Sequence, residues 1–159
     1  MSAATEIEFR MMAMDEGDAA LLAQAMRAEI AAIYDGMDLD SPAMHKAGIA
    51  ELGPPHGAFL VGYRDGVPIC CGGVKRLDDR HCELKRMYVA PAARGAGVGR
   101  QLLRALEDTA RELGYAVARL DTGPRQPGAR HLYQSDGYAP IANFNGNPVA
   151  SFFGEKPLR

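Results

Sequence analysis

The sequence has no apolar stretch of the roughly 18 to 20 residues that a helix needs to cross a bilayer. Its first 14 residues also lack the continuous apolar core of a secretory signal peptide, because Glu6, Glu8 and Arg10 interrupt them. We therefore expect neither a membrane span nor a secretory leader. The expected location is the cytoplasm.

Cysteine is scarce, with three residues at positions 70, 71 and 82 and no Cys-x-x-Cys pair. This odd number argues against a disulfide framework and fits a reducing compartment. Cys70 and Cys71 are neighbours in a predicted strand, so they should face opposite sides of a sheet as small buried apolar groups. The histidines show no metal-ligand spacing with Cys or Asp, and we expect no bound metal ion.

Neither sign of charge dominates, since 18 Lys and Arg stand against 20 Asp and Glu, for a formal net charge of −2. Such a chain has no long-range attraction to nucleic acid or to anionic lipid, and we expect neither as a partner. Glycine and proline are abundant instead, with 18 and 10 residues. That composition is typical of tight turns and of places where backbone approaches a ligand closely.

Hydrophobic periodicity predicts a strand and then a helix near the N-terminus. Residues 7–11 alternate between apolar and polar, as in a half-buried strand. Apolar side chains then recur at helical spacing as far as Tyr34, and Asp15 or Asp18 is the expected N-terminal cap. A short second helix is expected over residues 41–52, with proline in its first turn.

The sequence from residue 58 onward predicts further strands and helices. Three successive antiparallel strands are expected at 58–63, 67–74 and 82–89, the first two joined by an Asp-Gly hairpin turn. The remaining expected elements are a helix, a strand, a short helix and two closing strands, at 98–113, 115–120, 126–135, 138–142 and 149–156. Without an internal repeat or linker, this order predicts one mixed α/β domain over residues 1–159.

The most informative segment is the loop that leads into the helix at 98–113, and residues 89–103 read VAPAARGAGVGRQLL. Alternate glycines leave room for close approach, and free N–H groups at a helix start favour an anion. Arg94 and Arg100 add positive charge, so a diphosphate-bearing ligand is indicated. The P-loop pattern fails because no Lys-Ser/Thr follows, and the dinucleotide pattern fails because position 100 is arginine. The alternative is a glycine-rich turn that binds nothing.

Residues 83–103, ELKRMYVAPAARGAGVGRQLL, resemble the acyl-CoA-binding core of the GNAT superfamily of N-acetyltransferases, whose motif reads [Q/R]-x-x-G-x-[G/A] after the fourth strand. Residues 129–138, ARHLYQSDGY, are similar to that family's A-x-x-L-Y-x-x-x-G-[F/Y]. Residues 152–158, FFGEKPL, resemble the last strand of small bacterial members. The resemblance implies a twisted, mostly antiparallel sheet that is flanked by helices and splayed between its fourth and fifth strands. It also implies an acetyl-CoA-dependent N-acetyltransferase.

The resemblance places acetyl-CoA on particular residues. Backbone groups of Met87, Tyr88 and Val89 would bond the pantetheine arm, and the Val89 N–H would polarise the thioester carbonyl. Gln126 stands where many relatives have an asparagine that bonds the arm, and its longer side chain leaves that role open. The diphosphate would lie on the loop that contains Arg94, Gly95, Ala96, Gly97, Val98, Gly99 and Arg100.

Glu83 and Tyr133 are the catalytic residues that the resemblance implies. Deprotonating an amine with a pKa of ~10.4 at pH 7 costs roughly 4.6 kcal/mol, so a general base is valuable. Glu83 shares a strand face with Met87 and occupies the position of the general-base glutamate in several relatives. The alternative is a glutamate paired with Lys85 or Arg86. Tyr133 matches a tyrosine beside the CoA sulfur, where it would protonate the departing thiolate or only hold the sulfur. The alternative is a core aromatic.

The acceptor would enter opposite CoA, between the segment 34–57 and the loop 143–148. Polar candidates for its recognition are Tyr34, Asp35, Asp38, Asp40, His56 and Asn145, with ordinary loop residues as the alternative. We expect a small-molecule primary amine that attacks directly in a ternary complex. Acetylation of a protein lysine or N-terminal amine, and a non-catalytic acyl-CoA-binding module, remain open. The resemblance also allows a homodimer.

Overall fold

The computed structural model describes residues 6–39, 41, 42, 44 and 46–159. The strands in these residues are β1 (Glu8–Met11), β2 (Ala58–Arg64), β3 (Val67–Arg76), β4 (His81–Val89), β5 (Val117–Thr122), β6 (Ala139–Pro140) and β7 (Phe152–Pro157). The helices are α1 (Gly17–Ile33), α2 (Val98–Glu112) and α3 (Pro127–Ser135), with a 3-10 turn η2 (Pro91–Ala93). Among these described residues, no helix combines the length and apolar character of a membrane crossing.

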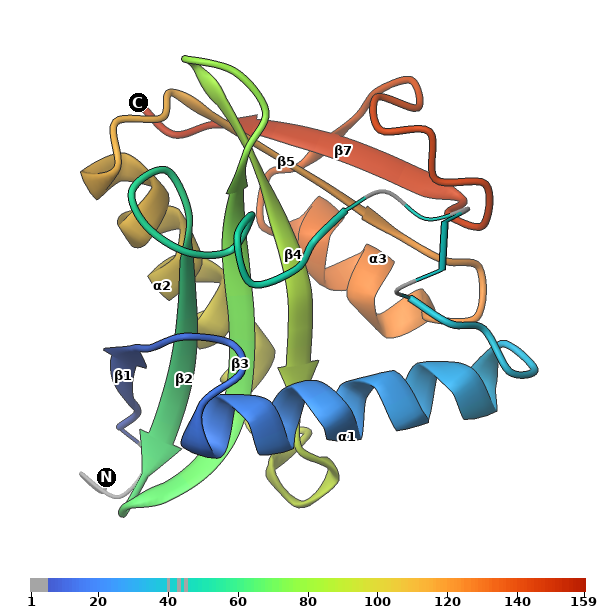
Figure 1. The fold of residues 1–159 in the computed structure, drawn as a ribbon. Coiled ribbons are helices and arrows are strands. Elements are labelled where there is room, and N and C mark those ends of the chain that lie inside the picture. The colour runs from blue at the N-terminus through green and yellow to red at the C-terminus, as the bar shows by residue number, and fades with distance from the viewer. Residues whose placement is uncertain (1–5, 40, 43, 45) are drawn as a thin grey trace.

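All seven strands form one sheet in the order β1-β2-β3-β4-β5-β7-β6 (Figure 1). Every neighbouring pair is antiparallel except β4 and β5, which are parallel. The mixed, mostly antiparallel sheet is the predicted architecture. Asp65 and Gly66 have φ angles of 52° and 78°, so the hairpin between β2 and β3 turns through two left-handed residues, as the Asp-Gly pair predicted.

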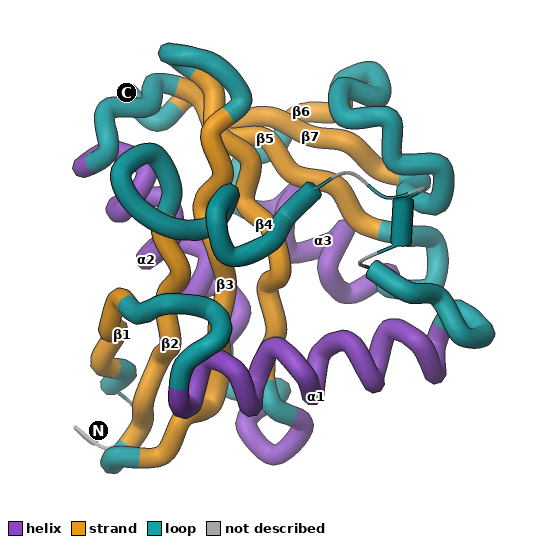
Figure 2. The backbone as a smooth tube through the Cα atoms, in the orientation of Figure 1, coloured by secondary structure: helices purple, strands orange, loops and turns teal. Residues whose placement is uncertain are grey.

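Different helices cover the two faces of the sheet (Figures 1 and 2). On one face, Leu22 and Met26 of α1 pack with a buried cluster from the middle strands. On the other face, Leu102 and Leu106 of α2 are fully buried in a second cluster, which also contains Tyr133 of α3. The described residues between α1 and β2, drawn as loop in Figure 2, lie on the α1 side, since Ala47 and Leu52 belong to the same cluster as Met26. The sheet therefore separates two apolar cores.

The adjacent cysteines demonstrate this separation, because Cys70 belongs to the α2 cluster and Cys71 to the α1 cluster. Burial raises the pKa of the thiols of Cys70, Cys71 and Cys82 to about 12. At pH 8 these thiols are neutral and shielded, so we expect dithionitrobenzoate to label fewer than about 0.1 thiols per folded chain. All three should react after unfolding in guanidinium. Fast labelling of the native protein would contradict their burial.

A buried carboxylate stabilises the α2 side of the sheet. Glu107 is 2% exposed; its Oε2 accepts a 2.8 Å hydrogen bond from the Tyr138 hydroxyl, and both its oxygens lie 3.1 Å from Lys156 Nζ. Removing one partner of a buried pair is costly, so Glu107→Ala should lower the free energy of unfolding by about 3 kcal/mol. Tyr138→Phe keeps the ion pair and should cost about 1 kcal/mol. Urea denaturation measures both, and equal losses in the two variants would contradict this account.

The predicted helix over 41–52 was wrong, since the described residues of that segment form turns and bends. Leu52 N donates to Gly48 O, and Gly57 N donates to Gly53 O, so the chain closes into separate turns. One glycine, Gly48, and scattered apolar side chains provide no continuous stripe that a helix could bury. Leu52 is buried and fastens the segment to the core.

The predicted cap of α1 was also wrong. The residue at the N-cap is Glu16, and its side chain makes no capping hydrogen bond. Asp18 lies inside the first turn, where its Oδ2 accepts a 2.6 Å hydrogen bond from the Tyr63 hydroxyl of β2. Asp18 therefore fastens the helix to the sheet, because the tyrosine offers a tertiary donor that the sequence alone could not place.

The fifth strand begins two residues later than predicted, at Val117 instead of Tyr115. Tyr115 precedes the strand, and its hydroxyl donates to the His56 carbonyl at 2.7 Å. The strand consequently runs on to Thr122, and it includes Asp121. This shift matters for the site, because it places an acidic residue near the end of β5.

Candidate active site

The sheet opens between β4 and β5. These strands pair from His81 opposite Val117 to Glu83 opposite Arg119, and their register ends there within the described residues. Beyond that point β4 contains a β-bulge. One residue lies between Cys71 and Gly73 on β3, whereas two residues lie between their partners, Tyr88 and Lys85, on β4. Arg86, in the bulge, has a φ of 59°. A bulge re-aims its strand, and the predicted splay between the fourth and fifth strands is confirmed.

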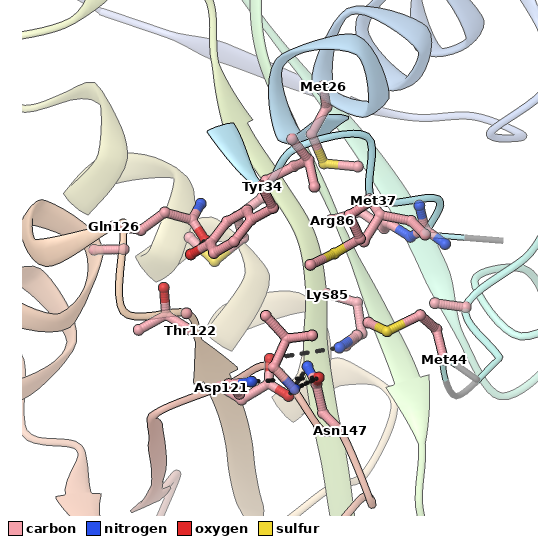
Figure 3. A pocket seen from close by; sticks show the side chains of 18 of the residues that line it. Met26, Tyr34, Met37, Met44, Lys85, Arg86, Asp121, Thr122, Gln126 and Asn147 are labelled. Carbon is pink, nitrogen blue, oxygen red and sulfur yellow. Dashed lines mark hydrogen bonds and ion pairs between the residues drawn. The ribbon is translucent and has the colours of Figure 1, made fainter. Parts of the chain in front are cut away.

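A cavity of about 170 Å³ lies at this opening (Figure 3). Its lining combines α1 and the segment after it with β4, β5, α3 and the residues before β7. Apolar groups including Met26, Ile30 and Met37 lie on the α1 side. Lys85 and Asp121 form a charged region across the cavity, as Figure 3 shows. The cavity therefore has an apolar part and a charged part.

Five side chains form a hydrogen-bonded network in the charged part. Asp121 Oδ2 accepts hydrogen bonds from Asn145 Nδ2 at 2.7 Å and from Asn147 Nδ2 at 3.1 Å. Asn145 Nδ2 also donates to Glu83 Oε2 at 2.8 Å. Lys85 Nζ lies 3.1 Å from Glu83 Oε2 and 3.6 Å from Asp121 Oδ1. The network thus joins β4, β5 and the loop before β7.

Glu83, the predicted general base, lies behind this network. It is fully buried and is not among the residues that line the cavity, whereas its partner Lys85 lines it. Pairing with Lys85 was the alternative interpretation of this glutamate, and the ion pair is present. The acidic residue that does line the cavity is Asp121, which the sequence analysis missed. Its signal was available, because this acidic residue directly follows the strand expected at 115–120, beside the expected splay.

Tyr133 of α3 lines the cavity opposite the bulge. Its hydroxyl contacts Met87 Sδ at 3.6 Å, and its ring packs edge-on against Tyr138, with 6.2 Å between the ring centroids. Burial raises the pKa of Tyr133 above its ordinary value, and the nearby charge of Asp121 adds to the effect. The phenol is therefore protonated at neutral pH, so it has a proton to donate and is not a phenolate base.

The glycine loop has open backbone amides. Gly95 and Gly97 have φ angles of 88° and 78°, and a Cβ atom at either position would meet nothing within 4 Å. Gly97 is the N-cap of α2, which has no side-chain cap. Arg94 N donates to Pro91 O, whereas the amides of residues 95–99 have no acceptor among the described residues. The N-terminus of α2 therefore presents a row of N–H groups that suits an anion.

The two arginines of the loop contact the protein itself. Arg94 Nε donates to Val89 O at 2.8 Å, and its Nη2 contacts both carboxylate oxygens of Glu29 at 2.7 and 2.9 Å. Arg100 Nη2 donates to Ser135 Oγ at 2.8 Å. Arg94 thus connects α1 to the end of β4 through hydrogen bonds, and Arg100 connects α2 to α3 in the same way. Their charges remain beside the amides, with side chains 45% and 43% exposed.

Tyr34 reaches across the cavity from the end of α1. Its hydroxyl donates to Gln126 Oε1 at 3.2 Å and accepts from the Arg125 backbone N–H at 3.1 Å. A Cβ atom at Gly123 would collide with the Tyr34 hydroxyl and ring, so a larger residue there would force the Tyr34 side chain to move. Both Tyr34 and Gln126 line the cavity.

The other residues expected at the acceptor have different positions. Asn145 bonds the charged network, as described above. Asp35 is exposed and pairs with Arg125 at 3.0 Å, and Asp38 is exposed. His56 is not among the residues that line the cavity. Asp40 lies outside the described residues. Of this set, the structure brings Tyr34 and Asn145 to the site.

A splayed sheet, a cavity at the splay and a glycine loop at a helix start are together the features of an N-acyltransferase fold. The family model described as "Acetyltransferase (GNAT) family" matches residues 23–138. The chain therefore belongs to the GNAT family of acetyltransferases, and it is an N-acetyltransferase.

Individual relatives agree with this assignment. An IAA acetyltransferase of Azospirillum brasilense is 37% identical over 118 residues, which cover 72% of this chain and 76% of the relative. A solved structure from Klebsiella pneumoniae, described as an acyl-CoA N-acyltransferase, has 28% identity and a TM-score of 0.78, and 98% of this chain and 99% of that chain are covered. The PaiA N-acetyltransferase of Thermoplasma acidophilum, solved in complex with coenzyme A, has the same fold at 17% identity and a TM-score of 0.68, with 96% and 99% covered.

Proposed function

We propose that the protein transfers the acetyl group of acetyl-CoA to the primary amine of a small-molecule acceptor, by direct attack in a ternary complex. The observation that carries the proposal is that residues expected at the donor and at the acceptor line one cavity, at the splay between β4 and β5. The same space is lined by Met87, expected at the pantetheine arm, and by Tyr133, expected beside the sulfur. It is also lined by Tyr34 and Asn147, on the acceptor side. A continuous space lets donor and acceptor meet without a covalent enzyme intermediate.

The chain's own residues fit acetyl-CoA. The amides of residues 95–99 offer the donors that a diphosphate needs. Ala90 N donates to Ile69 O at 2.8 Å, so antiparallel alternation turns the N–H and C=O of Val89 away from β3 and toward the slot. The N–H of Val89 suits the pantetheine arm and its thioester end, whereas its C=O already accepts the hydrogen bond from Arg94 Nε. The amide NH2 group of Gln126 can donate to the same arm, since its Oε1 is the atom that Tyr34 bonds.

In this proposal each residue has a stated task. Acetyl-CoA supplies an activated thioester. The Val89 N–H polarises its carbonyl, because a fixed donor stabilises the charge that develops there. Tyr133 donates a proton at the departing sulfur, as its raised pKa allows. Glu83 assists loss of the amine proton through water, because it has no direct face on the cavity.

A panel of small primary amines with acetyl-CoA, monitored by release of free thiol, tests the proposed function. Turnover of at least one small amine is the expected result. Acetylation of lysine-containing peptides with no turnover of small amines would instead identify a protein acetyltransferase. Calorimetric binding of CoA without transfer to either acceptor would identify a binding module and overturn the proposal.

A further inference from the structure

Resting on the proposed function, we infer that Tyr34 is a positioning residue for acetyl-CoA. Its hydroxyl orients the side chain of Gln126, so that the NH2 group of that side chain is presented to the pantetheine arm. Tyr34 itself lines the acceptor side of the same cavity. A residue at the end of α1 thus orders the binding site of the donor from the side of the acceptor.

The side chain of Gln126 depends on Tyr34 for its orientation. Among the residues that the structure describes, the Tyr34 hydroxyl is its one hydrogen-bond partner. Gln126 is the N-cap of α3, but its side chain makes no capping hydrogen bond. A long glutamine side chain that lines a cavity loses rotational freedom when it binds a ligand. A partner that fixes it beforehand therefore favours binding of the arm.

The direction of the hydrogen bonds at the Tyr34 hydroxyl decides which end of the Gln126 amide is left for a ligand. The backbone N–H of Arg125 can only donate, so the hydroxyl oxygen accepts from it, at 3.1 Å. The one proton of the hydroxyl then goes to Gln126, whose Oε1 accepts it at 3.2 Å. The NH2 group of Gln126 remains for the ligand, and it suits the amide carbonyl oxygens of a pantetheine arm.

Tyr34 is held in place where α1 ends. Asp35 and Gly36 have φ angles of 58° and 91°, so the chain leaves the helix through two left-handed residues directly after Tyr34. Arg125 Nη1 donates to the Ile33 carbonyl at 2.8 Å and to Asp35 Oδ2 at 3.0 Å. These bonds join the end of α1 to the segment before α3, at the residues on either side of Tyr34.

The same two segments approach each other closely at Gly123. A Cβ atom there would collide with the Tyr34 hydroxyl and ring, so the ring packs directly against the backbone. Figure 3 shows the Tyr34 ring next to the Gln126 side chain. Phenylalanine at position 34 keeps this packing and removes only the hydroxyl. Tyr34→Phe is therefore a specific test of the hydrogen bond to Gln126.

Calorimetric titrations with two ligands test the inference. CoA is compared with 3′-phosphoadenosine diphosphate, which keeps the adenosine and the diphosphate but lacks the pantetheine arm. Tyr34→Phe should raise the dissociation constant of CoA about fivefold, the effect of one lost hydrogen bond, and leave that of the truncated ligand within about twofold of the parent. Unchanged CoA affinity would overturn the inference. Equal weakening of both ligands would also overturn it, because a distorted fold does not distinguish them by the arm.

A second variant tests whether Tyr34 acts through Gln126. Gln126→Ala should raise the dissociation constant of CoA about tenfold. Adding Tyr34→Phe to it should change that constant by less than about twofold, because the hydroxyl then has no amide to orient. Multiplied effects in the double variant would overturn the inference.

The matched control is Tyr63→Phe, which also removes a tyrosine hydroxyl that is bonded to α1. That hydroxyl donates to Asp18 at 2.6 Å, and Tyr63 is not among the residues that line the cavity. CoA affinity in this variant should stay within about twofold of the parent. A loss equal to that of Tyr34→Phe would assign the effect to a loosened α1 and overturn the inference.

Kinetics with an amine that the protein acetylates provide a further readout. In Tyr34→Phe, KM for acetyl-CoA should rise about fivefold and kcat should stay within about twofold of the parent, because Tyr34 positions the donor and takes no part in the chemical step. A fall in kcat at unchanged CoA affinity would overturn the positioning role. If no amine is acetylated although CoA binds, the proposed function fails, and the titrations still decide the role of Tyr34. If CoA does not bind the parent protein, both fail.

Discussion

Replacing Gly97 by valine should weaken CoA binding at least about 100-fold, which corresponds to about 2.7 kcal/mol. Gly97 has a φ of 78°, and a β-branched residue adopts such a backbone only with strain. The loop must therefore shift, and with it the amides that we expect to hold the diphosphate. The valine methyl groups would also occupy the space in front of α2, where a Cβ atom now meets nothing within 4 Å.

Gly66→Val provides the matched control for this change. Gly66 has the same φ of 78° and the same open surroundings, but it lies in the turn between β2 and β3. Both variants should lose about 1–2 kcal/mol of folding free energy from the backbone strain. Only the Gly97 variant should lose affinity in a calorimetric titration with CoA. Similar affinities in the two variants would mean that the diphosphate binds elsewhere.

Tyr133→Phe should lower kcat about 100-fold, with KM for the amine and the dissociation constant of CoA within about threefold of the parent. The hydroxyl already contacts one sulfur atom, Met87 Sδ at 3.6 Å, so the site accommodates a sulfur at this distance. The raised pKa of the phenol keeps its proton available for a departing thiolate. Losing the hydroxyl should therefore slow the chemical step while binding persists.

Tyr138→Phe is the control, because the two rings are neighbours and the Tyr138 hydroxyl donates to Glu107, away from the cavity. Its kcat should match that of the parent protein. The pH profile adds a second check. Since burial raises the pKa of Tyr133 above the ordinary tyrosine value near 10, its ionisation should cause no fall in kcat below about pH 10. A fall near pH 8 that disappears in Tyr133→Phe would contradict the proton-donor role.

Periodicity and local motifs predicted much of the fold. The strands from 58 to 89, the helix from 98 and the glycine loop were each encoded by neighbouring residues, such as Asp65-Gly66 and the stripe of leucines on α2. Elements that depend on tertiary partners were predicted less well. Closing strands were expected at 138–142 and 149–156, yet β6 spans only Ala139–Pro140 and β7 begins at Phe152. In the residues between them, asparagine side chains bond backbone N–H groups that a strand ladder would use.

The candidate site was predictable where it depends on backbone and less so where it depends on side-chain partners. The free backbone N–H groups of residues 95–99 were predicted from the spacing of the glycines. The roles of Glu83 and Asp121 depended on which carboxylate reaches the cavity, and this is decided by the position of Lys85 and of two asparagines more than 20 residues beyond β5. A contact across that distance leaves no periodic signal in the sequence.

The short parallel pairing of β4 with β5 has a thermodynamic consequence. Past Glu83, one edge of β4 has no strand partner among the described residues, so its backbone groups remain available to another extended molecule. A linear ligand that bonds this edge would complete the ladder in place of polypeptide. Binding of such a ligand would then be linked to the stability of the sheet on both sides of the opening. A ligand that occupies this edge of β4 should therefore also raise the melting temperature of the protein.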